Sequence, residues 1–181
     1  MRLVSIASGS SGNCIYVGND NTHLLVDVGI SAKRIEAGLK EIDLCGKDLD
    51  GILITHEHSD HIQGIGVMAR KYGIPIYATR GTIQEILQKK TLGDIDVSLF
   101  ESIQADSPFM IKDMEINSMR ISHDARDPVA YRFRTGDKSA AIATDMGTYD
   151  DYTVDCLKGL DVLLLEANHD INMLQVGPYP Y

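Results

Sequence analysis

Residues 55–61, Thr-His-Glu-His-Ser-Asp-His, bring three imidazoles and two carboxylates into one short stretch directly after the apolar run 51–54. His56 and His58 are two positions apart, so on a helix their side chains would point to nearly opposite sides. At the end of a strand or in a turn the two side chains can converge. Imidazole and carboxylate are the ligands that borderline divalent metals such as zinc favour. A single histidine would usually belong to a solvated, charged loop. Three histidines and an aspartate at this spacing after an apolar run instead predict a metal site.

The spacing His-x-His-x-Asp-His in residues 56–61 resembles the signature of the metallo-β-lactamase superfamily. The resemblance implies an α+β fold, the four-layer αβ/βα metallo-β-lactamase sandwich. It also implies one or two metals between two β-sheets and hydrolysis of esters, amides or phosphodiesters. Further ligands are then expected downstream.

The apolar runs and turn residues predict alternating strands and helices in the first half of the chain, and short alternating strands of an antiparallel meander from Val97 onward. Asp60 and His61 open a predicted helix over residues 62–72. No repeat or linker interrupts the chain, so residues 1–181 are interpreted as one metallo-β-lactamase-like domain with helices outside. Strands are expected over residues 3–7, 14–17, 23–28, 51–55, 75–77, 109–112, 115–121, 129–134 and 139–144, with a buried strand over 160–166. Further helices are expected over residues 31–41, from 79 or 82 to 90, and 149–157.

The composition is that of an ordinary globular domain. Apolar residues make up 44% and charged residues 24% of the 181 residues. No run approaches the roughly 20 apolar residues of a membrane span. The first residues read as a strand and not as a signal peptide, so no membrane association and a cytoplasmic location are expected.

Three cysteines, Cys14, Cys45 and Cys156, have no CxxC spacing. Their odd number argues against a disulfide framework and fits a reducing compartment. A ligand or nucleophile among them is conceivable, but a small buried hydrophobic residue is the better interpretation of each.

The formal net charge of −9 opposes tight, sequence-independent binding of nucleic acid by electrostatics alone. Many of the acidic residues are candidate ligands, however, and bound divalent ions would reverse the local field. The basic clusters 70–71, 89–90 and 132–134 are interpreted as solvated surface. The net charge therefore does not exclude nucleic acid as a substrate.

His123 and Asp145 each follow a predicted strand. A lone histidine at such a place is normally a surface residue, and an aspartate before a Gly-containing turn commonly forms an Asx bond. The resemblance implies instead that His123 is the third histidine of the first metal and that Asp145 bridges two metals. Metal one would then be held by His56, His58 and His123, and metal two by Asp60, His61 and Asp145.

Zinc is the expected metal at both positions, with manganese or iron as alternatives, because the ligand types alone do not name the ion. Family members with two metals complete the second site with a later histidine, and His169 is the last imidazole here. The last elements of the fold are missing as well. A C-terminally truncated chain, a substitute role for His169 and an incomplete second site are the alternatives, and we favour truncation.

Further site residues are less specific. Glu166 and His169, beside Asn168, end the last predicted strand and are candidate acid–base groups, or merely satisfy a loop. The Ser/Gly loop 8–13 can approach a phosphate or form a plain hairpin. Asp27 resembles the aspartate that orients a ligand imidazole in many family members.

Taken together, the motifs most resemble the YycJ/WalJ-like branch, which is related to ribonuclease Z-type phosphodiesterases and regarded as a DNA exonuclease group. The hypothesis is hydrolysis of a phosphodiester, with nucleic acid as the substrate. A metal-bound hydroxide would attack, Asp60 would orient it, and Glu166 or His169 would protonate the leaving oxygen.

Three alternative functions remain. A thioester hydrolase of the glyoxalase II type uses the same ligands, and a mono-iron persulfide dioxygenase fits a deficient second site. An inactive binding module fits a truncated chain that cannot close its site. Turnover of S-lactoylglutathione without phosphodiesterase activity would select the first. One bound iron with oxygen consumption would select the second.

Overall fold

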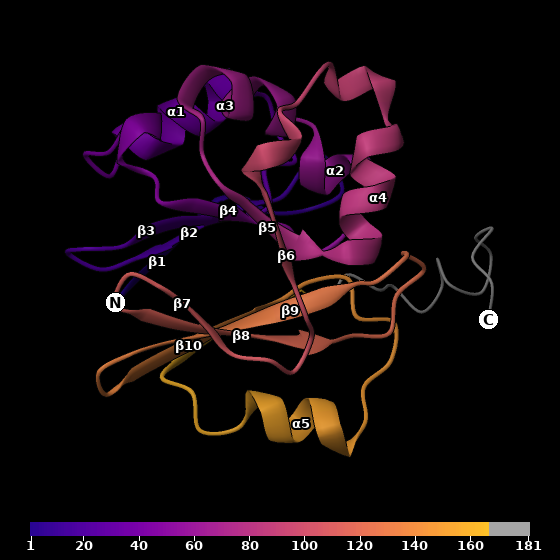
Figure 1. Cartoon of the computed structure of the whole chain (residues 1–181). Coiled ribbons are helices and arrows are strands. Elements are labelled where there is room, and N and C mark those ends of the chain that lie inside the picture. Colours follow the sequence, from indigo (N-terminus) through magenta and orange to yellow (C-terminus); the bar gives the residue numbers. More distant parts are fainter. Residues whose placement is uncertain (167–181) are drawn as a thin grey trace.

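A computed structural model describes residues 1–166 and contains two β-sheets that face each other. Figure 1 shows helices above the first sheet, the second sheet below it, and one helix beneath the second sheet. This is the α/β/β/α layering expected from the sequence. No helix in residues 1–166 has the length and apolar character needed to cross a bilayer.

The first sheet contains six strands in the order β1-β2-β3-β4-β5-β6. The first three strands pair antiparallel through tight connections, whereas β3 to β6 pair in parallel. Parallel neighbours need crossover connections, and helices supply most of them. The strands are β1 (Arg2–Ala7), β2 (Cys14–Gly18), β3 (His23–Val26), β4 (Gly51–Leu53), β5 (Ile76–Thr79) and β6 (Phe100–Ile103).

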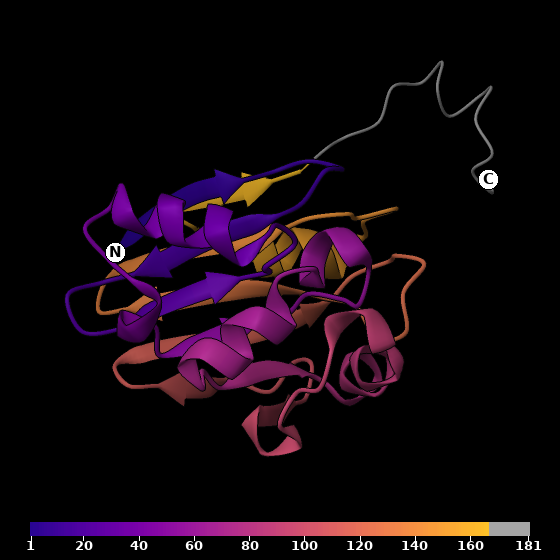
Figure 2. The same ribbon diagram turned by 90° about the horizontal axis from the view of Figure 1, so that it is seen from above.

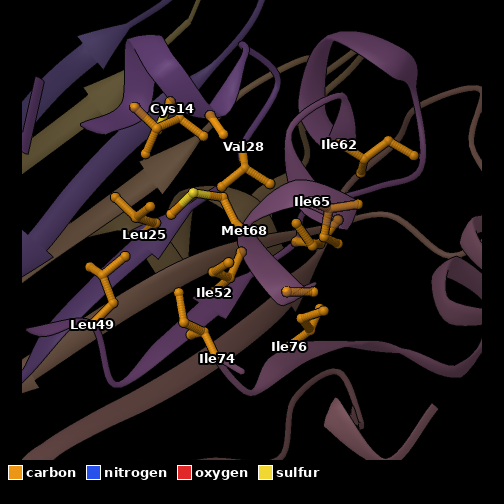
Figure 3. Packing of buried hydrophobic residues seen from close by; sticks show 14 of the residues in the cluster. Cys14, Leu25, Val28, Leu49, Ile52, Ile62, Ile65, Met68, Ile74 and Ile76 are labelled. Carbon is orange, nitrogen blue, oxygen red and sulfur yellow. The ribbon is translucent and has the colours of Figure 1, made fainter. Parts of the chain in front are cut away.

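Helices cover the outer face of the first sheet, as Figure 1 and Figure 2 show. Figure 3 shows Ile62, Ile65 and Met68 from these helices packed with Leu25 and Ile52 of the strands. The helices bury one apolar face because hydrophobic residues recur at helical spacing. They are α1 (Ala32–Lys40), α2 (Ser59–Ile62), α3 (Ile65–Tyr72) and α4 (Arg80–Gln88), and the short 3₁₀ turns are η1 (Gly46–Asp48), η2 (Lys90–Leu92) and η3 (Val97–Leu99).

The second sheet has the order β11-β10-β9-β8-β7 and is antiparallel except for the β10–β11 pair. A second apolar cluster, which includes Leu24, Tyr131 and Phe133, fills the space between the sheets. A smaller cluster lies between the second sheet and α5. The elements are β7 (Phe109–Ile111), β8 (Met114–Arg120), β9 (Val129–Thr135), β10 (Lys138–Ala143), α5 (Asp151–Leu157) and β11 (Val162–Leu165).

The helix expected over residues 62–72 is wrong as one continuous element. The chain forms α2 and α3 instead, and Gly64 lies between them. The Gly64 N–H donates to the Val28 carbonyl at 2.7 Å, and a Cβ at this position would lie 2.5 Å from the Ile30 carbonyl oxygen. This close approach of the β3–α1 connection requires glycine and interrupts the helix.

Two other sequence predictions are corrected at the sheet edges. Strand β6 was not expected, because its polar residues Glu101 and Ser102 hide the apolar pattern. The final strand was expected to be buried, but Val162, Leu163 and Leu165 are 40–49% exposed in the part of the chain that is described. Among residues 1–166 the strand is at the edge of the second sheet and has a neighbouring strand on one side only.

The cysteines differ from one another in burial. Cys14 is buried as expected, and burial raises the pKa of its thiol far above the usual range. Cys45 is exposed, contrary to expectation, and Cys156 is half-buried. Cys45 lies at the start of η1, where its backbone N–H donates to Asp48.

Candidate metal centre

The candidate ligands all follow the carboxyl ends of strands at one edge of the sandwich. In the first sheet β3 and β4 are parallel neighbours, so Asp27 and His56 emerge side by side. In the second sheet β8 and β10 both run antiparallel to β9 and therefore in the same direction. His123 follows β8, and Asp145 follows β10. The order and direction of the strands thus bring four distant segments together.

The first donor group consists of His56, His58 and His123. His123 Nε2 lies 3.2 Å from His56 Nε2 and 3.2 Å from His58 Nδ1. Two nitrogens that each lie about 2.0–2.1 Å from one tetrahedral zinc ion are about 3.3 Å apart. The three nitrogens therefore have the spacing that a single cation requires, and the donor set fits zinc.

The second donor group consists of His56, His61 and Asp145. Asp145 Oδ2 lies 2.8 Å from His61 Nε2 and 3.8 Å from His56 Nε2. His56 therefore belongs to both groups. Asp60, which the sequence assigned to metal two, lies farther out, with its Oδ2 3.7 Å from His61 Nε2 and its side chain one-third exposed.

Asp27 contacts His61 on the side of the imidazole ring that faces away from the second donor group. Its fully buried carboxylate accepts hydrogen bonds from the Thr55 N–H at 2.9 Å and the Thr55 hydroxyl at 2.8 Å, and it lies 2.8 Å from His61 Nδ1. A carboxylate at Nδ1 assigns the ring proton to that nitrogen and turns the Nε2 lone pair toward the centre. Asp27 has a φ of 58°, a left-handed conformation that aspartate tolerates better than most residues.

The second sheet also anchors the backbone of the signature segment. The buried Tyr131 hydroxyl donates to the Ile54 carbonyl at 2.8 Å, and the Val129 N–H donates to the Thr55 carbonyl at 3.0 Å. Because strands of both sheets hold this segment, the backbone that carries His56 is fixed in position.

The crowded imidazoles have strongly shifted pKa values. Burial, followed by repulsion from His61 and the other imidazoles, lowers the pKa of His56 to about 2. Burial alone would lower the pKa of His61, but the Asp27 and Asp145 carboxylates outweigh it and raise the pKa to about 10. The Asp27 and Asp145 carboxylates thus favour positive charge on the His61 imidazole, whereas burial keeps the His56 imidazole neutral.

Glu57 of the signature region makes two contacts that the sequence did not suggest. The Glu57 side chain is buried, and its Oε1 accepts the Arg126 N–H at 2.8 Å, which joins the signature loop to the loop after His123. The Lys89 ammonium donates to the Glu57 carbonyl at 2.7 Å. Lys89 was interpreted as solvated surface, and no local pattern links it to residue 57.

The Ser/Gly loop 8–13 lies against the same site. The Asn13 N–H donates to the Asp60 carbonyl at 2.7 Å, and Asn13 Nδ2 lies 3.1 Å from His61 Nε2. The loop is therefore more than a plain hairpin connection, although its sequence signal did not single out Asn13.

Glu166 follows β11, and its N–H donates to the Ala143 carbonyl at 3.0 Å. Burial and the nearby Asp145 carboxylate raise the pKa of Glu166, so its carboxyl group holds a proton more readily than an exposed one. Asn168 and His169, the other predicted acid–base candidates, lie outside the described residues 1–166.

The chain is similar to known proteins over nearly its whole length. A family model described as a beta-lactamase superfamily domain matches residues 22–177. Exodeoxyribonuclease WalJ from Streptococcus pneumoniae serotype 2 strain D39 is 44% identical over 97% of this chain and 65% of its own length. Exodeoxyribonuclease YycJ from Bacillus anthracis is 41% identical over 97% of this chain and 66% of its own length.

Solved structures agree on the fold. The Rm3 metallo-beta-lactamase superposes with a TM-score of 0.68 at 15% identity, over 90% of this chain and 74% of that one. The chain spans 65–66% of the length of the two exodeoxyribonucleases that it matches.

Proposed function

Because this chain belongs to the metallo-β-lactamase superfamily, we propose that it is a metal-dependent phosphodiesterase that hydrolyses nucleic acid, with DNA as the first candidate. Two relatives that match nearly the whole chain are named exodeoxyribonucleases, which supports this substrate class over the thioester and persulfide alternatives.

The observation that carries the proposal is the pair of donor groups that share His56. One group offers three imidazole nitrogens, and the other offers two imidazoles and the Asp145 carboxylate. Divalent cations held there would supply a water of lowered pKa and would offset the negative charge of the phosphoryl oxygens. We assign His56, His58 and His123 to the first cation and His61 and Asp145 to the second, with zinc as the metal.

We also assign roles to three further polar groups. The partly exposed Asp60 carboxylate is close enough to the second group to bind its cation or to orient a nucleophilic water. We assign Glu166, whose carboxyl pKa is raised, the role of the acid that protonates the leaving oxygen. His169 keeps its predicted role as an alternative acid.

The net charge of −9 is compatible with this proposal. Several acidic side chains, including Asp60 and Asp145, gather at the centre, where cations would neutralise them. We also propose a reducing, cytoplasmic environment, because the three cysteines are unpaired. A thiol titration of protein purified under non-reducing conditions should find three free thiols.

The first test compares wild type with His58→Ala. Purified protein is analysed for bound metals and assayed on bis(p-nitrophenyl) phosphate and on single- and double-stranded DNA and RNA. The variant should lose at least about a thousandfold in kcat on the phosphodiester, because the first cation loses one of three protein ligands.

His23→Ala is the matched control, since His23 lies at the start of β3 and the centre lies beyond the end of that strand. It should retain metal and activity. Full activity of His58→Ala would refute the assignment. Hydrolysis of S-lactoylglutathione by a wild type that cleaves no phosphodiester would select the thioesterase function instead.

A further inference from the structure

A groove of about 440 Å³ lies beside the candidate metal centre. Asp60 lines the groove and also lies 3.7 Å, by its Oδ2, from His61 Nε2. The groove therefore opens next to the place where the scissile phosphate would bind. The residues that give it its chemistry are Ser10, Ser11, Ser59, Asp60, Lys89 and Thr91.

The lining is suited to a phosphate and poorly suited to an apolar ligand. Four hydroxyl groups face or border the groove, and Ile62 and Leu92, its apolar residues, are buried in the core beneath. Serine and threonine hydroxyls and lysine ammonium groups are common partners of nucleic-acid phosphates. Lys89 and Asp60 are the charged residues of the lining. A cation at the metal centre would offset the negative charge of Asp60.

The Lys89 ammonium is held in place. It donates to the Glu57 carbonyl at 2.7 Å, which uses one of its three donors and fixes it beside the loop between His56 and His58. Lys89 is half-buried at the end of α4, whereas its neighbour Lys90 is exposed. A positive charge that is already ordered loses less side-chain entropy when it binds a phosphate.

The Ser/Gly loop that contributes Ser10 and Ser11 to the lining is ordered by hydrogen bonds as well. The Gly9 N–H donates to Asn13 Oδ1 at 2.9 Å, and the Gly12 N–H donates to the Gly9 carbonyl at 2.9 Å. The Asn13 N–H in turn donates to the Asp60 carbonyl. These bonds fix Ser10 and Ser11 relative to Asp60, although both serines are exposed.

From this geometry we propose that the groove binds a second phosphate of the nucleic-acid strand, next to the phosphate that is cleaved. Lys89 neutralises that phosphate, and Ser10, Ser11, Ser59 and Thr91 offer it hydrogen bonds. The inference rests on the proposed phosphodiesterase function and adds the reason why a polynucleotide is preferred to a small diester. Lys89 is a positioning residue, because it holds the strand and not the reacting atoms.

The test compares Lys89→Ala with Lys90→Ala, which removes the same charge outside the groove. Kinetics are measured on a single-stranded oligonucleotide and on bis(p-nitrophenyl) phosphate, which has only one phosphate. Lys89→Ala should raise KM for the oligonucleotide about tenfold, the cost of one charged contact, with a smaller change in kcat. The ratio of kcat/KM on the oligonucleotide to kcat/KM on the small diester should fall by a similar factor.

Three further measurements separate strand binding from a structural effect. The slope of log binding constant against log salt concentration should shrink by about 0.7 in Lys89→Ala, the value for one lost contact to single-stranded nucleic acid. Lys89→Arg should restore most of the affinity. Ser10→Ala with Ser11→Ala should raise KM about threefold, whereas Ser8→Ala, outside the groove, should not.

The outcomes distinguish the two proposals. A wild type that cleaves neither substrate contradicts the phosphodiesterase function itself. If the wild type cleaves both substrates and Lys89→Ala behaves like Lys90→Ala, the proposed phosphate binding in the groove is wrong, but the phosphodiesterase function stands. Equal losses on both substrates in Lys89→Ala would mean that Lys89 acts only by supporting Glu57 and would also overturn the groove.

Discussion

Asp27 shows how a single buried residue can control the chemistry of its neighbours. Its carboxylate contacts Thr55 and His61 without any exposed surface, so these two residues offset its buried charge. A buried charge that lacks partners costs several kcal/mol, roughly 3–5 by analogy with broken buried pairs. Asp27 is therefore coupled to the orientation and charge of the His61 imidazole.

The substitution Asp27→Asn tests this coupling. Asparagine keeps the shape and tolerates the left-handed backbone at residue 27, but it removes the charge that favours His61 as a ligand. Metal affinity, measured by competition with a chromophoric chelator, should fall about 10- to 100-fold. Asp50→Asn, at the opposite end of β3, is the control and should bind metal normally. Unchanged metal affinity in Asp27→Asn would contradict the proposed role of Asp27 in orienting His61.

At the scale of elements, the contact between the β3–α1 connection and α2 sets the position of the signature helix. The Val28 N–H donates to the His61 carbonyl at 2.8 Å, and a Cβ at Gly29 would lie 1.5 Å from the Asp60 carbonyl oxygen. No side chain fits between these two segments. The backbone of α2 is thus packed directly against the segment that follows Asp27.

Gly29→Ala should therefore be more harmful than a typical glycine substitution. The added methyl group must displace α2, and the free energy of unfolding should fall by about 3 kcal/mol, as for overpacking of a tight site. Gly73→Ala is the comparison: its φ is 64°, but no atom lies within 4 Å, so the loss should be about 1–2 kcal/mol. Urea unfolding of both variants measures the difference. Equal losses would contradict the tight contact.

At the scale of the whole molecule, the candidate centre joins the two sheets. His56, His58 and His61 follow β4 of the first sheet, whereas His123 and Asp145 follow β8 and β10 of the second. A bound cation would therefore link segments that otherwise meet through the apolar cluster between the sheets. Binding to the folded chain alone would stabilise the whole sandwich.

Metal binding should thus be visible as thermal stabilisation. At a zinc concentration about 100 times the Kd, the gain is about 2.7 kcal/mol, which corresponds to a rise in Tm of about 5–10 °C for a domain of this size. Differential scanning fluorimetry with zinc and with a chelator measures this change. His58→Ala should lose most of the rise, and an equal rise in that variant would place the metal elsewhere.

Local patterns in the sequence were enough to predict the candidate ligand types and most of the secondary structure. His56, His58 and His61 lie within six residues, and their spacing after an apolar run is a local signal. Strands such as β2, β4 and β9 were predicted because their apolar runs are short and continuous or alternate with polar residues. His123 and Asp145 were expected from family resemblance, since neither carries a specific local pattern.

Which of these side chains contact one another depends on how the two sheets fold and pack. The parallel register of β3 with β4 places Asp27 beneath His61, and the antiparallel order of the second sheet brings His123 within 3.2 Å of His56. Packing also brings the Lys89 ammonium to the Glu57 carbonyl. Strand order leaves the last described strand at an exposed edge of the second sheet. Ligand chemistry belongs to single residues, whereas distances between remote residues depend on strand order and packing, which no short stretch of sequence encodes.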